Sequence, residues 1–147
     1  MSTESTSTAS STSHRPERTG RGFETVLIAV YGIFALSATA RSLVQVRRDF
    51  SFAPVAYSLS LLAAVTYIAV TIALVRRGRS SRAVRILCIA ELAGVLTVGS
   101  LTLLDPALFP DGTVWGIFGR DYGFMPLLLP VVALLYLSRA RPSGPAD

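Results

Sequence analysis

The stretch AVRILCIAELAGVLTVGSLTLL, residues 83–104, decides the fold of this chain. A helix of this length measures roughly 33 Å, which is enough to cross a hydrocarbon core of about 30 Å. Asp105-Pro106 follows it directly, and proline disfavours the helical conformation in the residue before it. The stretch therefore predicts a membrane-spanning helix with one acidic residue, Glu91, in its interior.

Further apolar blocks lie on either side of this stretch. Together they give predicted spans at about 23–41, 54–75, 83–104 and 122–138. The last block is short and contains Pro126 and Pro130, which a membrane helix tolerates where neighbouring groups satisfy the freed carbonyls. The blocks show no alternation with period two, so a barrel is not indicated. We expect an all-α membrane protein, an antiparallel four-helix transmembrane bundle, with a membrane domain over residues 23–141.

The composition excludes several classes of protein. Of 147 residues, 51% are hydrophobic and 16% are charged, and the mean hydropathy is +0.53. A soluble domain has about 25% charged residues. All 14 basic residues are arginine, a composition associated with GC-rich bacterial genomes. These arginines flank the apolar blocks, which indicates membrane topology and not nucleic-acid binding. One cysteine, Cys88, and one histidine, His14, leave no disulfide, histidine-based metal site or catalytic triad, so we expect no metal and no cofactor.

The segments outside the membrane domain are polar. Residues 1–22 are rich in Ser, Thr and Arg and predict a disordered tail, and residues 142–147 form a short C-terminal tail. The first span ends in Ala38-Thr39-Ala40, which has the pattern of a signal-peptide cleavage site. Because the block is long for a signal peptide, and the tail before it is long too, we expect a retained span.

Arginine counts predict the orientation. With four spans, the two tails and the 76–85 link lie on one side and hold ten arginines. The opposite side holds four: Arg41, Arg47, Arg48 and Arg120. The positive-inside rule therefore places both termini in the cytoplasm of a bacterial plasma membrane.

The two links on the opposite side carry opposite charge. Residues 41–53 have a net charge of +2 and residues 105–123 a net charge of −2. We expect them to lie against each other, with Arg41 near Asp105 or Asp121. The alternative is that these are solvated charges, each of which contributes little. The aromatic residues of 105–123 are typical of a membrane–water interface.

Glu91 is the strongest candidate for a functional residue. A charged side chain inside the hydrocarbon region costs roughly 2–3 kcal/mol, so we expect it to face the bundle interior in its neutral form. Its candidate hydrogen-bond partners are Tyr67, Thr66, Tyr31 and Tyr136. It either carries a proton or a cation, or it joins helices through a hydrogen bond. Cys88 lies on roughly the same face and is best interpreted as a core cysteine.

Small residues four apart mark candidate packing faces. Ala56, Ser60 and Ala64 form one such stripe, and Ala90 and Gly94 form a second pair. This spacing lets another membrane helix approach closely.

Three segments resemble a known family: YGIFALSATARS at 31–42, DPALFPDGTVW at 105–115 and GRDYGFMPLLLPVVALLYL at 119–137. They are similar to an uncharacterised family of small four-span integral membrane proteins from actinobacteria, over roughly residues 25–138. The resemblance implies a membrane protein and brings no activity with it. The chain also resembles small multidrug exporters in size and span number, but their membrane glutamate lies in the first span and Glu91 lies in the third.

Three functions remain open at this point. The first is a non-enzymatic accessory or scaffold subunit that packs in the bilayer against other membrane proteins or itself, with no catalytic residues. The second is a small homodimeric transporter coupled to protons or cations through Glu91. The third is an enzyme of envelope lipids that acts through the 105–123 loop.

Overall fold

The computed structural model describes residues 17–139, and every regular element within that range is a helix. The long helices are α1 (Glu17–Asp49), α2 (Pro54–Arg77), α3 (Arg82–Leu104) and α4 (Met125–Arg139). Two short 3₁₀ helices, η1 (Pro106–Leu108) and η2 (Gly116–Tyr122), lie between α3 and α4. Local signals fit these bounds, since Pro54 opens α2 and the Ser81 hydroxyl accepts a hydrogen bond from the Ala83 amide at the start of α3.

Three helices, α1, α2 and α3, are long and apolar enough to cross a membrane. The 15-residue α4 does not pass that test alone, but η2 and α4 together do, and they meet at a bend of 99°. The described chain thus has three, or up to four, candidate spans, and is compatible with a multi-pass membrane protein.

The first span differs most from the expected bounds. Helix α1 begins at Glu17 and ends at Asp49, so it extends past both ends of the predicted span 23–41. Residues 1–16 of the predicted disordered tail, and the predicted C-terminal tail 142–147, lie outside the described residues.

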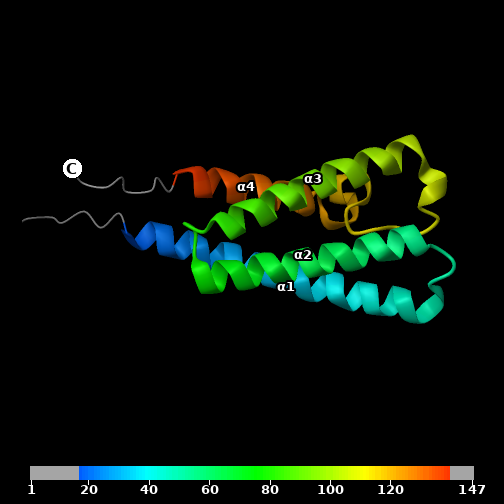
Figure 1. Cartoon of the computed structure of the whole chain (residues 1–147), viewed down its shortest axis with the longest axis horizontal. Helices are drawn as coiled ribbons and strands as arrows, with labels where there is room; N and C mark the ends of the chain where they lie inside the picture. The colour runs from blue at the N-terminus through cyan, green and yellow to red at the C-terminus, as the bar shows by residue number, and fades with distance from the viewer. Residues whose placement is uncertain (1–16, 140–147) are drawn as a thin grey trace, which may run out of the picture.

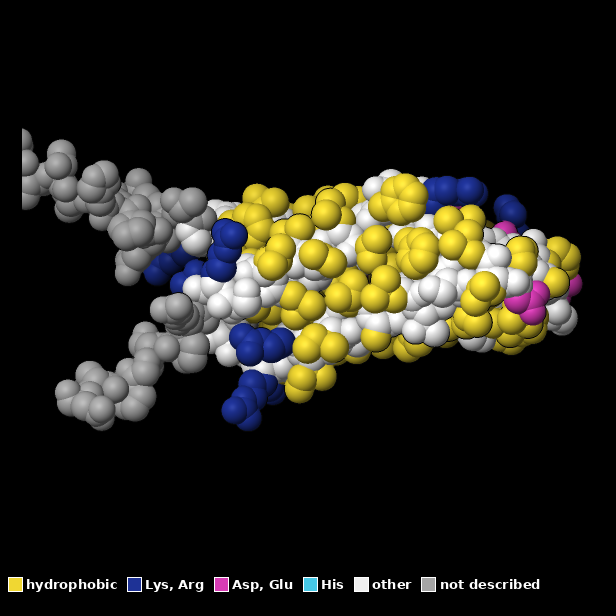
Figure 2. Space-filling view, turned by 90° about the horizontal axis from the view of Figure 1, so that it is seen from above, with side chains coloured by type: hydrophobic (Ala, Val, Ile, Leu, Met, Phe, Trp, Pro, Cys, Tyr) yellow, Lys and Arg dark blue, Asp and Glu magenta, His cyan; other side chains and the backbone are white. Residues whose placement is uncertain are grey.

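The four long helices run along one common axis (Figure 1). The chain reverses direction after α1 and after α2, and the first turn of α1 and the last turn of α4 lie at the same end. The segment 105–124 begins at the opposite end, which we call the loop end, and runs back beside α3, where Trp115 reaches Gly94. Hydrophobic side chains cover most of the length of the face seen in Figure 2, with charged side chains gathered toward both ends.

Small residues on α2 form the inner packing face of the chain. Ala56, Ser60 and Ala64 are each at most 2% exposed, and α1 packs extensively against α2. The Ser60 hydroxyl lies 3.4 Å from the Thr113 hydroxyl of the loop end. The stripe predicted as a packing face is therefore used within the chain and is not available to a second protein.

Two glycines of α3 receive aromatic rings from the loop end. A Cβ atom at Gly94 would lie 2.7 Å from Cζ3 of Trp115, and a Cβ atom at Gly99 would overlap the ring of Phe118. Gly94 therefore contacts a loop, whereas its predicted companion Ala90 is exposed. Through these two contacts the segment 105–124 packs against α3.

The Gly99 contact predicts a stability difference between two glycine-to-alanine variants. In Gly99→Ala the added methyl group displaces the Phe118 ring, and we expect a loss of about 1–3 kcal/mol from overpacking. Gly22→Ala is the matched control, since nothing lies within 4 Å of its new methyl group and the gain in helix propensity is the same. Thermal unfolding in detergent, followed by circular dichroism, measures both. Equal midpoints for the two variants would contradict the packing of Phe118 on Gly99.

Candidate functional site

The structure places Glu91 inside the molecule, on the face of α3 that points toward α1. The side chain is 0% exposed, and its Oε2 accepts a hydrogen bond of 2.8 Å from the hydroxyl of Tyr31 on α1. Tyr31 is also 0% exposed. A hydrogen bond between buried side chains therefore joins the first and third helices.

This hydrogen bond lies near the middle of the apolar segments. Glu91 follows the first residue of α3 by about nine residues and precedes the last by about thirteen, or roughly 14 Å and 20 Å along the helix. Tyr31 lies midway between Arg21 and Arg41. Both side chains are fully buried, so their polar groups depend on partners within the protein.

One oxygen of the Glu91 carboxyl group has no partner. Oε1 is buried and accepts no hydrogen bond within the described residues. The Tyr31 hydroxyl also lies 3.9 Å from the Sγ atom of Cys88, so a carboxyl, a phenol and a thiol form one buried cluster. Groups of this kind can hold and exchange protons. Within residues 17–139 no cluster of three potential metal ligands is found.

The other predicted partners of Glu91 make different hydrogen bonds. The Thr66 hydroxyl donates to the Leu62 carbonyl of its own helix at 2.8 Å. The Tyr136 hydroxyl donates to the Gly20 carbonyl at 2.7 Å, close to the end where α1 begins.

Tyr67 forms a second layer around the buried cluster. Its ring centre lies 6.3 Å from that of Tyr31, and its hydroxyl accepts a 3.1 Å hydrogen bond from Nε1 of Trp115. We expected Trp115 at a membrane interface, but it is 2% exposed and covers this cluster from the loop end. The only sequence signal for that placement is the small residue, Gly94, that the indole ring covers.

The two oppositely charged links meet at the loop end, where Arg41 Nη2 and Asp121 Oδ2 would lie 3.0 Å and 3.3 Å from a Cβ atom at Gly112. Arg41 donates to the Gly112 carbonyl at 3.0 Å and to the Tyr122 hydroxyl at 3.5 Å. The Nε2 atom of Gln45 donates to the same Gly112 carbonyl at 3.0 Å. Asp105 and Asp121 are exposed, and neither accepts a hydrogen bond from Arg41. The segments are thus held by a backbone acceptor, and net charge does not reveal such a contact.

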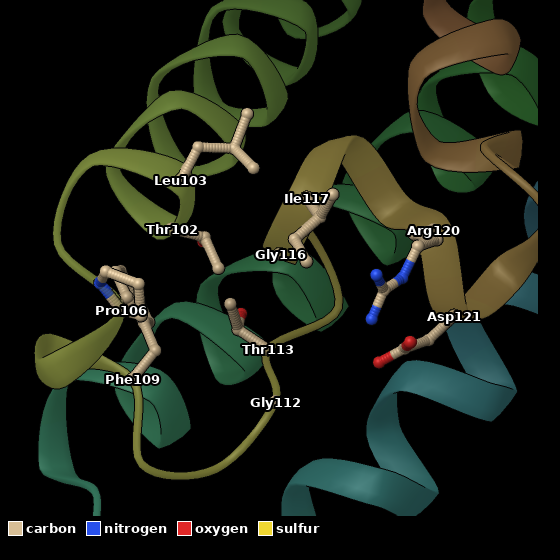
Figure 3. A pocket seen from close by; sticks show the side chains of 10 residues that line it. All are labelled: Thr102, Leu103, Pro106, Phe109, Gly112, Thr113, Gly116, Ile117, Arg120 and Asp121. Carbon is tan, nitrogen blue, oxygen red and sulfur yellow. The ribbon is translucent and has the colours of Figure 1, made fainter.

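A pocket of about 370 Å³ opens at the loop end, between the last turn of α3 and the segment 106–121 (Figure 3). Its lining is mainly apolar and includes Pro106, Phe109 and Ile117. Arg120 and Asp121 supply the charged part of the lining. Most of the pocket lining belongs to the 105–123 loop, in which the sequence placed a possible enzyme site, but the shape of the pocket was not predictable from the sequence.

The backbone beside this pocket is strained. Ile117, Phe118 and Gly119 have φ angles of 47°, 58° and 79°, a left-handed turn that costs roughly 1–2 kcal/mol for each non-glycine residue. The turn places Phe118 against Gly99 while Ile117 lines the pocket. The surrounding contacts therefore hold a conformation that the sequence alone does not favour.

The Tyr31–Glu91 hydrogen bond predicts a specific coupling in stability. Tyr31→Phe removes the donor and leaves both carboxyl oxygens without a partner, so we expect a loss of about 1–3 kcal/mol. In a Glu91→Leu background the same change should cost much less, because only the long contact to Cys88 Sγ remains. Thermal unfolding in detergent of the wild type, both single variants and the double variant measures the coupling. An equal cost of Tyr31→Phe in both backgrounds would refute it.

No family model, curated protein or solved structure matches the chain. The resemblance to an actinobacterial membrane family stays a prediction. The buried cluster around Glu91 and the pocket at the loop end are the features from which function has to be inferred.

Proposed function

We propose that the chain is an antiparallel four-helix transmembrane bundle of a bacterial plasma membrane, with both termini in the cytoplasm. Three helices are each long and apolar enough to cross a membrane, and the bent pair of η2 and α4 passes the same test when taken as one broken span, which supports a fourth crossing. The first turn of α1 and the last turn of α4 share one end, where the arginine-rich 76–85 link also lies. That distribution of arginine supports a cytoplasmic location for this end.

Within that bundle, we infer that the chain is a non-enzymatic accessory or scaffold subunit. The observation that carries this proposal is the outward face of α3, the side opposite Glu91. Spacings of three and four residues place small exposed side chains in one line along it: Ala90, Ala93, Thr97 and Ser100. Small residues permit close approach of a second membrane helix, which associates mainly through van der Waals packing.

The outward side of α3 also exposes Ile89 and Leu96 beside this line, but the outward face of α2 has no comparable line of small residues. It presents large aliphatic side chains, among them Leu61, Val65 and Ile72, which suit contact with lipid. The hydroxyl groups of α3 also differ from one another. The Thr102 hydroxyl donates to the Val98 carbonyl, whereas the Thr97 and Ser100 hydroxyls have no such bond in the described part of the chain. A hydroxyl that faces lipid without a partner is unfavourable, and a neighbouring helix would supply one.

A bulky side chain in this line should weaken association with a partner. We expect Ala93→Phe to lower the partner-bound fraction at least tenfold, because the phenyl ring holds the second helix away. Val65→Phe on the lipid-type face of α2 is the control and should leave association unchanged. Native mass spectrometry of the tagged chain, gently extracted from its host, measures the stoichiometry with a larger membrane protein or a second copy. Unchanged association of Ala93→Phe would exclude this face as the interface.

The buried carboxyl group supports a second candidate function, a homodimeric transporter coupled to protons or cations. The supporting observation is Oε1 of Glu91, a buried acceptor for which residues 17–139 provide no hydrogen-bond partner. Ionisable groups at this depth commonly mark ion and proton pathways. The accessory role needs this carboxyl group only as a link between α1 and α3, so the two functions predict different effects of an isosteric change.

Glu91→Gln separates the two candidates. It keeps the shape and the acceptor for Tyr31 but removes the exchangeable proton. A transporter variant should lose proton flux to the level of empty vesicles, and an accessory subunit should show no flux above that level even as wild type. Decay of an imposed pH gradient in proteoliposomes measures this, with Thr66→Val as a control, since the Thr66 hydroxyl bonds only its own helix. Wild-type flux that survives in Glu91→Gln would rule out Glu91 as the coupling site.

A further inference from the structure

The pocket at the loop end combines opposite charges with an apolar wall. Arg120 and Asp121, adjacent in the chain, line one side of it (Figure 3). Both residues are exposed, so their charged groups are accessible to a ligand. Arg41, the other basic residue nearby, is already engaged by the Gly112 carbonyl and the Tyr122 hydroxyl. Asp121 Oδ2 and Arg41 Nη2 both approach Gly112, but no hydrogen bond within the described residues engages the side chains of Arg120 or Asp121. The pocket therefore offers one cation and one anion to a ligand.

This pair of charges matches a ligand that carries both a phosphate and an ammonium group. A guanidinium group binds phosphate oxygens through charge-assisted hydrogen bonds, and a carboxylate accepts hydrogen bonds from a primary ammonium. A quaternary ammonium is recognised by a cage of several aromatic rings. Phe109 is the one aromatic residue in the lining, so the pocket favours a primary ammonium.

The apolar part of the pocket continues along α3. Leu103 lines the pocket and is 57% exposed, and Leu96, two turns earlier on the same side of the helix, is 46% exposed. In the membrane orientation that we propose, this track runs from the interface into the hydrocarbon core. This apolar track is suited to an acyl chain. Because a freely soluble ligand has no acyl chain, the track favours a lipid.

We propose that this pocket binds the headgroup of a zwitterionic phospholipid of the phosphatidylethanolamine type. Arg120 holds the phosphate, Asp121 holds the ammonium group, and one acyl chain follows Leu103 and Leu96. The lipid comes from the leaflet at the loop end. The left-handed turn at 117–119 fixes both the Ile117 wall and the position of Arg120 next to it. This inference rests on the proposed membrane orientation, but not on either proposed role of the bundle.

Native mass spectrometry of the full, delipidated chain in detergent tests this assignment. Dioleoyl phosphatidylethanolamine is the probe, and the matching phosphatidylcholine and phosphatidylglycerol are comparison lipids. We expect one retained phosphatidylethanolamine, bound about tenfold more tightly than either comparison lipid. Arg120→Gln should weaken this binding about tenfold or more, because the phosphate loses its charged donor. Asp121→Asn should remove the preference over phosphatidylglycerol, because the ammonium group loses its acceptor.

The controls distinguish this site from general attraction to lipid. Arg47→Gln removes an exposed arginine of the same end that does not line the pocket, and should bind like the wild type. Free phosphoethanolamine should compete at least a hundredfold less well than the lipid. Equal binding of all three lipids, full binding by Arg120→Gln, or equally strong competition by the free headgroup would each overturn the assignment. Carbonate extraction of membranes tests the embedding separately, so failure of the orientation is told apart from failure of the site.

Discussion

A carboxyl group buried within the protein must find its hydrogen-bond partner there, and this constraint fixes the rotation of α3. Glu91 faces α1 because the Tyr31 hydroxyl is there to donate to it. Once that face points inward, Gly94 and Gly99 face the loop segment and pack against Trp115 and Phe118. The small side chains on the opposite side of α3 are left facing outward. One hydrogen bond thus sets both the inner packing and the outer surface of this helix.

Much of the fold was predictable because length and hydropathy report directly on helices that cross a membrane. Helices α2 and α3 begin and end within a few residues of the predicted spans. The break before α4 was less predictable: Pro126 and Pro130 suggested a kink, whereas the chain turns by 99° at residues 123–124, and Phe124 has a positive φ. That geometry depends on the tertiary contacts of the loop end and not on local propensity.

The candidate site was likewise only partly predictable from the sequence. The inward direction of Glu91 follows from its cost in lipid, and depth alone suggested Tyr31 as one of several possible partners. Depth does not determine which hydroxyl lies on the facing side, so Thr66 and Tyr136 were equally plausible. Trp115 and the Arg41–Gly112 contact were not predictable, since one depends on a cavity above a glycine and the other on a backbone carbonyl. Composition carries no information about either.

The left-handed turn at 117–119 also makes the folding of the loop depend on α3. Its conformation is unfavourable in an isolated loop and is compensated only when Phe118 reaches the surface above Gly99. That surface exists only once α3 has formed and has taken up its final rotation. The turn and the packing of α3 therefore stabilise each other, and a change that rotates α3 would also release the loop.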